Sequence, residues 1–190
     1  MWRIVQALDG GISRIKLDAG HLEADQAEAV AAAAEDFAAG VVEVTNRSNL
    51  QIRGVGEDHQ GLVARLLAAG LGPREAAGDD VRNLMLSPVA GLDPAMRVDT
   101  RALGAQILDL LQTTPRFHEL SAKFAVQLDG GEDLAMLRHP HDLWLSPLTL
   151  DEQPWLAFGL AGCPANDAPL AAVPLADGLA PVSYTHLTLP

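Results

Sequence analysis

The stretch Thr45-Asn46-Arg47-Ser48-Asn49-Leu50-Gln51-Ile52-Arg53-Gly54 concentrates guanidinium and amide side chains in one short segment. Guanidinium groups bind planar, oxygen-rich anions through paired hydrogen bonds, and amides add further hydrogen-bonding groups. Apolar and polar residues alternate from residue 49, so an extended chain there places Asn49, Gln51 and Arg53 on one face. Arg47 joins that face if the strand begins by residue 47. The pattern predicts an anion-binding sheet face, although a merely solvated face would carry similar residues.

A small α+β unit is expected to position this stretch. The spacing of valine, leucine and isoleucine predicts strands over residues 12–17, 41–45 and 49–53. Apolar residues at helical spacing predict helices over residues 23–39 and 60–69, and a glycine follows each helix. The order strand, helix, strand, strand, helix predicts a ferredoxin-like fold. Both helices would then cover one sheet face and leave the other face free for a ligand.

The rest of the chain predicts a second α+β module. Residues 71–80 are rich in glycine, alanine and acidic residues and are expected to form a linker. A helix is predicted over residues 99–112, and Lys123–Asp129 alternates as a strand with one polar face. Further strands are predicted at Leu143-Trp144-Leu145 and over residues 155–160.

Composition excludes several classes of protein. The chain has 190 residues, a net charge of −12 and 48% hydrophobic residues, which is typical of a globular protein. Its acidity argues against binding to nucleic acid or to anionic membranes, both of which attract basic surfaces. A signal peptide or membrane span is not indicated. The single cysteine, Cys163, excludes an internal disulfide framework and favours a reducing compartment, so we expect a cytoplasmic protein.

The opening stretch is similar to the signature T-x-R-x-x-x-Q-x-[HR]-G of the sulfite and nitrite reductase superfamily, which Arg47, Gln51, Arg53 and Gly54 match. Within that superfamily, the chain most resembles the precorrin-3B synthases. The segments that carry this resemblance are Ile4-Val5-Gln6-Ala7-Leu8-Asp9-Gly10-Gly11, Asn49-Leu50-Gln51-Ile52-Arg53-Gly54 and Val126-Gln127-Leu128-Asp129-Gly130-Gly131. The resemblance extends from about residue 4 to about residue 180.

The resemblance implies a nitrite/sulfite reductase ferredoxin-like half-domain over residues 1–70 and part of a haem/cluster-type domain over residues 81–181. It implies the N-terminal part of an oxygenase of aerobic cobalamin biosynthesis, which hydroxylates precorrin-3A with lactone formation. Such an enzyme uses dioxygen and an electron donor, NADH- or ferredoxin-linked, and we expect the fragment alone to be inactive. The alternatives are a sirohaem-dependent sulfite or nitrite reductase and a non-enzymatic tetrapyrrole- or anion-binding module.

The resemblance also implies a set of ligand-binding residues, while no catalytic residue can be assigned. The expected tetrapyrrole- or substrate-binding residues are Arg47, Asn49, Gln51, Arg53, Arg82, Asn83 and Lys123. Arg82 could equally form a surface ion pair with an aspartate of the linker. Where the reductases carry Lys-Phe-Lys, this chain has Lys123-Phe124-Ala125. Reduction of an oxyanion needs several nearby cations, so the missing second lysine favours a tetrapyrrole oxygenase.

Metal ligands are sparse. The superfamily holds a 4Fe-4S cluster with four cysteines in two pairs, and neither pair is present, so the cluster is expected only in a full-length protein. His139-Pro140-His141-Asp142 could supply two histidines and a carboxylate to a non-haem iron, although loop histidines are more often solvated. The acidic residues Glu132, Asp133, Asp151 and Glu152 are expected to be solvated loop residues.

The last nine residues, 182–190, need a separate interpretation. They resemble the translation of a sequencing adapter read in frame and do not continue the preceding apolar pattern. We therefore expect residues 182–190 to be non-native, and no functional role is assigned to them.

Overall fold

The computed structural model describes residues 3–185. The chain divides into two compact units, Met1–Asp79 and Asp80–Pro190. Each unit contains one sheet, with four strands in the first and five in the second. The two units are described separately below.

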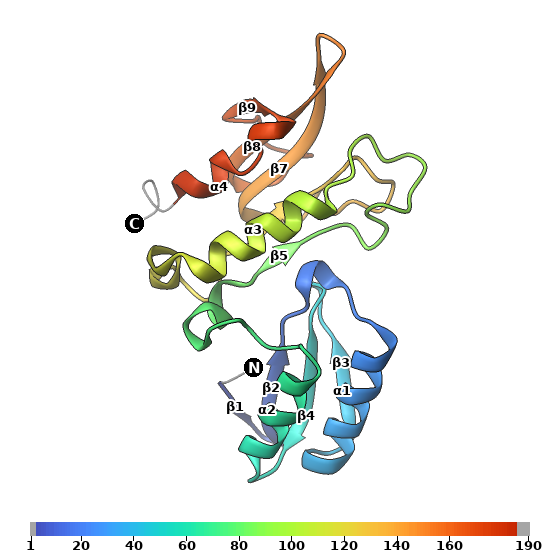
Figure 1. Cartoon of the computed structure of the whole chain (residues 1–190), viewed down its shortest axis with the longest axis vertical. Coiled ribbons are helices and arrows are strands. Elements are labelled where there is room, and N and C mark those ends of the chain that lie inside the picture. The colour runs from blue at the N-terminus through green and yellow to red at the C-terminus, as the bar shows by residue number, and fades with distance from the viewer. Residues whose placement is uncertain (1–2, 186–190) are drawn as a thin grey trace. The chain divides into compact units, whose positions relative to one another are not determined.

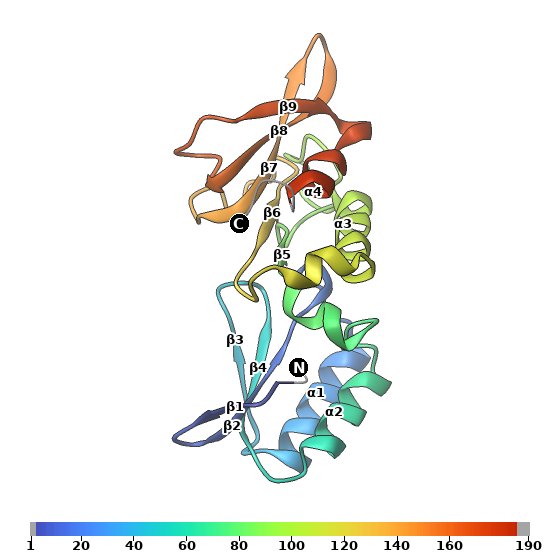
Figure 2. The same ribbon diagram turned by 90° about the vertical axis from the view of Figure 1, so that its left-hand side faces the viewer.

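The first unit is an antiparallel sheet with two helices on one face (Figure 2). Its elements are β1 (Val5–Ala7), β2 (Gly10–Ile15), α1 (Ala24–Phe37), β3 (Val41–Val44), β4 (Leu50–Val55) and α2 (His59–Ala68). The strand order is β1-β2-β4-β3. The predicted strands, helices and ferredoxin-like arrangement are present. Sequence reasoning missed β1, a short strand that forms a hairpin with β2 and extends the sheet.

The core of the first unit lies between the sheet and the helices. The strands contribute Ile15, Leu50, Ile52 and Val55, and the helices contribute Val30, Ala33, Ala34, Leu62, Val63 and Leu66. Both helices are capped at their amino ends by acidic residues. Glu23 forms a capping box with Gln26 at the start of α1, and the Asp58 carboxylate accepts a hydrogen bond from Gly61 N at 2.8 Å. All of this packing uses one sheet face, so the other face stays uncovered.

The backbone conformation at the end of the segment Thr45–Gly54 requires a glycine at position 54. Its φ of 70° lies in the left-handed region, and a Cβ built there would lie 2.5 Å from the Ala39 Cβ. Both the conformation and the space therefore exclude a larger residue. The same turn brings Gly54 close to Gly10, whose added Cβ would lie 2.9 Å from the Gly54 Cα. The Asp9-Gly10 turn is thus held against the strand that carries Arg53.

The second unit is a mixed sheet with one long helix, α3 (Arg101–Thr113), packed against β5 (Figure 1). Its strands are β5 (Leu84–Met85), β6 (Val126–Leu128), β7 (His141–Leu150), β8 (Gln153–Gly162) and β9 (Ala171–Pro174). They are hydrogen-bonded in this order. The pairs β5–β6 and β6–β7 are parallel, and the remaining pairs are antiparallel. Figure 1 shows the long β7–β8 hairpin extending beyond the rest of the sheet.

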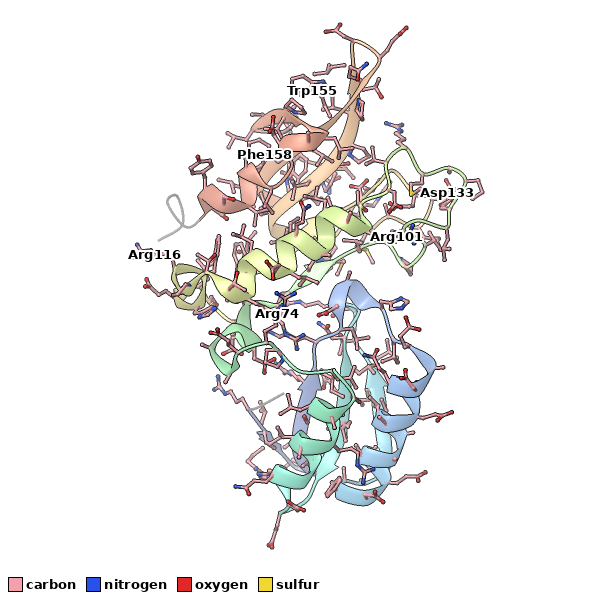
Figure 3. All side chains as sticks on the ribbon, in the orientation of Figure 1. Arg74, Arg101, Arg116, Asp133, Trp155 and Phe158 are labelled. Carbon is pink, nitrogen blue, oxygen red and sulfur yellow. The ribbon has the colours of Figure 1, made fainter. Side chains whose placement is uncertain are left out.

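One predicted strand of the second unit needs correction, and two others are longer than expected. The strand expected over Lys123–Asp129 is only Val126–Leu128, and all three of its residues are buried. The alternation was misleading because a strand between two parallel neighbours can be buried on both faces. The strands expected near residues 143–145 and 155–160 are parts of the longer hairpin. Trp155 and Phe158 both belong to its second strand, β8 (Figure 3).

The C-terminal part of the described chain contains a short helix, α4 (Ala180–Tyr184). Pro181 and Val182 are buried in it. The expected non-native segment 182–190 thus begins inside α4, and its residues 186–190 lie outside the described residues. Within residues 3–185, the helices are all too short or too polar to cross a bilayer.

Candidate functional site

The uncovered face of the first sheet, here called the outer face, carries two transverse rows of side chains. Strand register places one residue from each of the four strands in the first row, and residues from three strands in the second. The first row is Val5, Ile12, Arg53 and Val41, and the second row is Arg14, Gln51 and Glu43. The outer face therefore combines three apolar side chains, here called the apolar strip, with two guanidinium groups, one amide and the carboxylate of Glu43.

Arg53 is oriented by two carboxylates. Its Nε and Nη2 donate to Asp9 Oδ2 and Oδ1, each at 2.9 Å, and its Nη1 lies 3.4 Å from Glu43 Oε2. This bidentate pair lowers the pKa of Asp9 and raises that of Arg53, chiefly through the side-chain hydrogen bonds. Both side chains are partly exposed, so the pair stabilises the fold little. A ligand carboxylate could take the place of Asp9 at small cost.

Two of the predicted residues do not lie on the outer face. Strand β4 begins only at Leu50, so Arg47 lies exposed in the turn that joins β3 to β4. The condition for placing Arg47 beside Arg53 is therefore not met. Asn49 also precedes the strand, and its Oδ1 accepts a hydrogen bond from Leu17 N at 2.9 Å. The Asn49 side chain holds this turn to the segment after β2.

Sequence reasoning missed two contributors to the outer face. Arg14 lies directly opposite Gln51 and is exposed. The alternation over residues 12–17 already indicates that Arg14 points away from the core, but only the register places it beside Gln51. Asp9 comes from the β1–β2 turn and reaches Arg53 across the sheet. A contact between residues 44 positions apart has no local sequence signal.

A second group of predicted residues lies at one edge of the other sheet. Strands β5, β6 and β7 are parallel, so their amino ends meet at one edge, here called the amino edge. The buried side chain of Asn83 connects the backbone segments that meet at this edge. Its Nδ2 lies within hydrogen-bonding distance of the backbone oxygens of Asp80 and Ala122, each at 3.1 Å, and of Phe124 at 2.8 Å. Asn83 is buried and its amide is committed to the backbone, which is a structural role.

The charges at the amino edge differ from the expectation. Arg82 is only 2% exposed, whereas Lys123 is exposed in the turn before β6. Asp142, at the start of β7, adds a carboxylate here, whereas the sequence placed it only beside the two histidines. Its Oδ2 accepts a hydrogen bond from Ala125 N at 2.9 Å. Ala125, in place of the reductases' second lysine, therefore lies next to an acidic group.

His139 and His141, the weak candidates for metal ligands, lie close together. Their ring centroids are 4.9 Å apart, and His141 Nδ1 lies 2.8 Å from the backbone oxygen of His139. The neighbouring Asp142 carboxylate is bound to Ala125 N instead of turning toward the rings. Within residues 3–185, no group of three or more histidine, cysteine or carboxylate side chains could hold a metal ion. The structure therefore does not bring together the two histidines and the carboxylate that were named as a possible iron site.

The cysteine content does not fit an iron–sulfur cluster. Cys163 is the one cysteine among the 190 residues, and it is buried. A 4Fe-4S cluster requires several thiolate ligands, and a single thiolate cannot hold it. This sequence therefore does not contain the donor set for such a cluster.

A buried pair of carboxylates lies at the opposite end of β6. Asp129 and Glu132 are both almost fully buried, and their oxygens accept hydrogen bonds from Gly131 N and Gly130 N. The expectation that Glu132 is a solvated loop residue is wrong. Asp133, labelled in Figure 3, follows Glu132 in this loop, and its N–H donates to Asp93 Oδ2 at 2.8 Å.

Burial controls the protonation of Asp129. Desolvation raises the pKa of Asp129 to about 6, against the lowering effects of hydrogen bonds from Ser146 and Gly131. The charge of Glu132 raises this pKa further, and that of Arg97 lowers it. Asp129 thus titrates just below neutral pH.

Comparison with known families agrees with this division of the chain. Residues 6–70 match the nitrite/sulfite reductase ferredoxin-like half domain, and residues 77–185 match the nitrite and sulphite reductase 4Fe-4S domain. The chain belongs to the nitrite and sulfite reductase family. The matched domain is named for a cluster whose cysteine ligands this sequence lacks.

Individual members of the family are similar to this chain over part of their length. Ferredoxin–nitrite reductase of Synechococcus elongatus is 34% identical over 146 residues, which cover 74% of this chain and 28% of that protein. Precorrin-3B synthase of a Sinorhizobium species is 32% identical over 127 residues, covering 67% of this chain and 27% of that enzyme. The solved structure of Mycobacterium tuberculosis NirA protein shares the fold, with a TM-score of 0.69 at 20% identity over 88% of this chain and 32% of NirA. The chain thus spans less than a third of these relatives.

Proposed function

We propose that this chain binds a polycarboxylated tetrapyrrole and serves a precorrin-3B synthase-like oxygenase. The observation that carries the proposal is the uncovered outer face, on which Arg53 lies within the row of apolar side chains and Arg14 and Gln51 lie in the next row. A flat macrocycle can pack its rings on the apolar strip and place its peripheral carboxylates on the two guanidiniums. Gln51 lies between the arginines and can hydrogen-bond a further oxygen.

The ion pair of Arg53 suits this role. Asp9 and Glu43 hold the guanidinium above the sheet before a ligand arrives, which reduces the entropy lost on binding. A ligand carboxylate then exchanges with that of Asp9 in an exposed environment. Arg53 would therefore orient the macrocycle and fix its register on the sheet.

The amino edge favours oxygenation over reduction of a small oxyanion. Ala125 supplies no charge there, and Asp142 adds a negative one. Reduction of nitrite or sulfite needs several cations around the oxyanion, which this edge provides poorly. The proposed reaction inserts one atom of dioxygen into a C–H bond of precorrin-3A. The other atom leaves as water, with two electrons from an NADH- or ferredoxin-linked donor and two protons.

Reduction of nitrite or sulfite is the second candidate. Several relatives are named ferredoxin–nitrite reductases, including that of Zea mays at 35% identity over 144 residues. A relative in Mycolicibacterium paratuberculosis is named a sulfite reductase and is 28% identical over 172 residues. Lys123 is exposed at the amino edge and could contact an anion. Tetrapyrrole binding without turnover would fit a non-enzymatic binding module instead.

A competition experiment between a porphyrinoid and nitrite or sulfite distinguishes the proposed oxygenase from a reductase. The proposal predicts that the chain binds precorrin-3A, or uroporphyrin as a stable probe, and that millimolar nitrite or sulfite does not displace it. It also predicts that Ala125→Lys increases binding of either oxyanion, because the added positive charge offsets the negative charge of Asp142, whereas Ala122→Lys in the preceding turn has less effect. Isothermal titration calorimetry measures both quantities. Displacement of the porphyrinoid by nitrite or sulfite from the unmodified chain would favour the reductase.

A further inference from the structure

Two loops of the second unit are held together at the carboxyl end of β6. One is the segment 93–98 before α3, here called the covering loop, and the other is residues 129–133 after β6, here called the glycine loop. Arg97 N and Val98 N of the covering loop both donate to Gly130 O of the glycine loop, at 2.8 and 3.1 Å. The covering loop contains no helix or strand, so these two bonds tie an irregular segment to the end of a buried strand.

Close packing accompanies these hydrogen bonds. A Cβ added at Gly130 would overlap the Val98 backbone oxygen. One added at Gly131 would lie 3.0 Å from Arg97 Cγ and 3.3 Å from Pro147 Cγ. The glycine loop is thus covered by Arg97 of the covering loop and by Pro147 of β7. Because β7 is paired along its length with β8, the covering loop is the cover that can move.

Two carboxylates are buried at this junction. Asp129 is 2% exposed and Glu132 is 4% exposed. Asp129 Oδ1 accepts a hydrogen bond from Gly131 N at 3.0 Å. Glu132 Oε2 accepts one from Gly130 N at 2.7 Å, whereas within residues 3–185 Glu132 Oε1 has no hydrogen-bond partner. A buried carboxylate oxygen without a partner is costly, so ionisation of both groups is unfavourable while the loops are held together.

Charge is poorly balanced around Asp129. The groups that face it are the Gln127 amide of β6, the Ser146 hydroxyl of β7, Glu132 of the glycine loop and Arg97 of the covering loop. The charge of Glu132 disfavours ionisation of Asp129, and that of Arg97 favours it. Arg97 is exposed, so solvent screens its charge, whereas Glu132 is buried. Desolvation and the charge of Glu132 raise the pKa of Asp129 to about 6, so its proton is lost just below neutral pH.

We propose that these loops form a proton-operated clasp, which a proton on Asp129 keeps closed and loss of that proton opens. An ionised Asp129 requires hydration, and displacement of the covering loop admits water to the glycine loop while β6 and β7 stay paired. Opening breaks the two bonds to Gly130 O and the bond from Asp133 N to Asp93 Oδ2. Local opening of this kind is typical of irregular segments with few buried side chains. The clasp is separate from tetrapyrrole binding on the outer face.

Rising pH favours the open form. With the clasp closed, Asp129 holds its proton up to about pH 6, whereas the hydrated carboxyl of the open form releases it near pH 4. The opening constant therefore increases as pH rises between these values and becomes constant above them, once both forms are ionised. By this linkage it should increase about tenfold between pH 5 and pH 7.5.

Hydrogen exchange followed by NMR tests the proposal on the 190-residue chain. After correction for intrinsic exchange rates, protection of the Arg97 and Val98 amides should fall about tenfold from pH 5 to pH 7.5. Both should be less protected than the Val126 amide, which donates to Asn83 O at the other end of β6. Low urea concentrations should leave their exchange unchanged, because local opening exposes little surface. Protection that is independent of pH, or that equals that of Val126 with the same response to urea, would overturn the clasp.

Three variants identify the group that carries the proton. Asp129→Asn keeps an oxygen for Gly131 N but cannot ionise, so its covering loop should be as protected at pH 7.5 as at pH 5. Asp133→Asn, in the same loop but exposed, is the matched control and should retain the tenfold fall. Glu132→Gln removes the neighbouring charge and should shift the fall to lower pH.

Two results would overturn the assignment of the proton to Asp129. One is a fall in protection in Asp129→Asn equal to that of the original chain, and the other is an unshifted fall in Glu132→Gln. Tetrapyrrole is left out of every measurement, so the outcome is independent of the proposed function.

Discussion

Charged groups occur in two contrasting settings in this molecule. On the outer face of the first sheet, Arg53 shares two partly exposed carboxylates and faces solvent. At the carboxyl end of β6, Asp129 and Glu132 are almost fully buried and accept hydrogen bonds from the loop backbone. An exposed ion pair can exchange partners at little cost, whereas a buried polar group must keep its partners. The contrast therefore predicts ligand effects on the first surface and stability effects in the second unit.

The largest effect should come from Asn83, whose buried side-chain amide lies within hydrogen-bonding distance of three backbone oxygens. Asn83→Ala leaves three backbone oxygens without this donor and should lower the free energy of unfolding by about 3–4 kcal/mol. Lys123→Ala at the same edge is exposed and should change it by less than about 0.5 kcal/mol. Urea denaturation measures both variants. A loss below about 1 kcal/mol for Asn83→Ala would mean that water replaces the amide and that the edge is open.

The buried carboxylate predicts a pH dependence of stability. Because the pKa of Asp129 is raised to about 6, the folded protein retains a proton that the unfolded chain releases near pH 4. Stability therefore falls as pH rises from about 4 to about 6, by up to about 3 kcal/mol, and the loss is complete above that range. Asp129→Asn should remove this slope and raise the free energy of unfolding at pH 7.

Chemical denaturation at several pH values measures this slope. Asp133→Asn, in the same loop but exposed, is the matched control and should leave the slope unchanged. An Asp129→Asn variant that is less stable than the original chain at pH 7 would contradict the prediction. Such a result would mean that Arg97 and the backbone donors fully compensate the buried charge.

The smallest effect concerns the exposed pair. Asp9→Asn removes the carboxylate that competes for Arg53, so affinity for a polycarboxylated porphyrinoid should rise about two- to fivefold. Glu43→Gln removes a single longer contact and should increase affinity less. Fluorescence titration with uroporphyrin compares them. Weaker binding by Asp9→Asn would contradict this prediction. It would mean that orientation of Arg53 by Asp9 matters more for affinity than competition between Asp9 and the ligand carboxylate.

The sequence predicted the architecture of the first unit better than its site. Periodicity places Leu50 and Ile52 inward and Gln51 and Arg53 outward, because burial of one face alone determines that pattern. It could not show that the strand starts too late to include Arg47. The partner of Arg53 is set by a long-range contact across the sheet, which no local pattern encodes.

In the second unit, local patterns were less informative. Strand β6 is covered on both faces, so Gln127 and Asp129 sit at positions that alternation assigns to solvent. Asp142 could not be placed beside Ala125 before the parallel pairing of β6 and β7 was known. Parallel strands bring together residues far apart in the chain, and register decides which of them meet.

The central claim is that Arg14 and Arg53 bind the carboxylates of a tetrapyrrole on the outer face. Titration of uroporphyrin with the Arg14→Ala/Arg53→Ala double variant tests it most directly, with Arg65→Ala on α2 as the control on the helix-bearing face. We predict at least about tenfold weaker binding by the double variant, since two charge-assisted contacts are lost, and no change for Arg65→Ala. Equal affinity of the double variant and the original chain would contradict the assignment of the outer face.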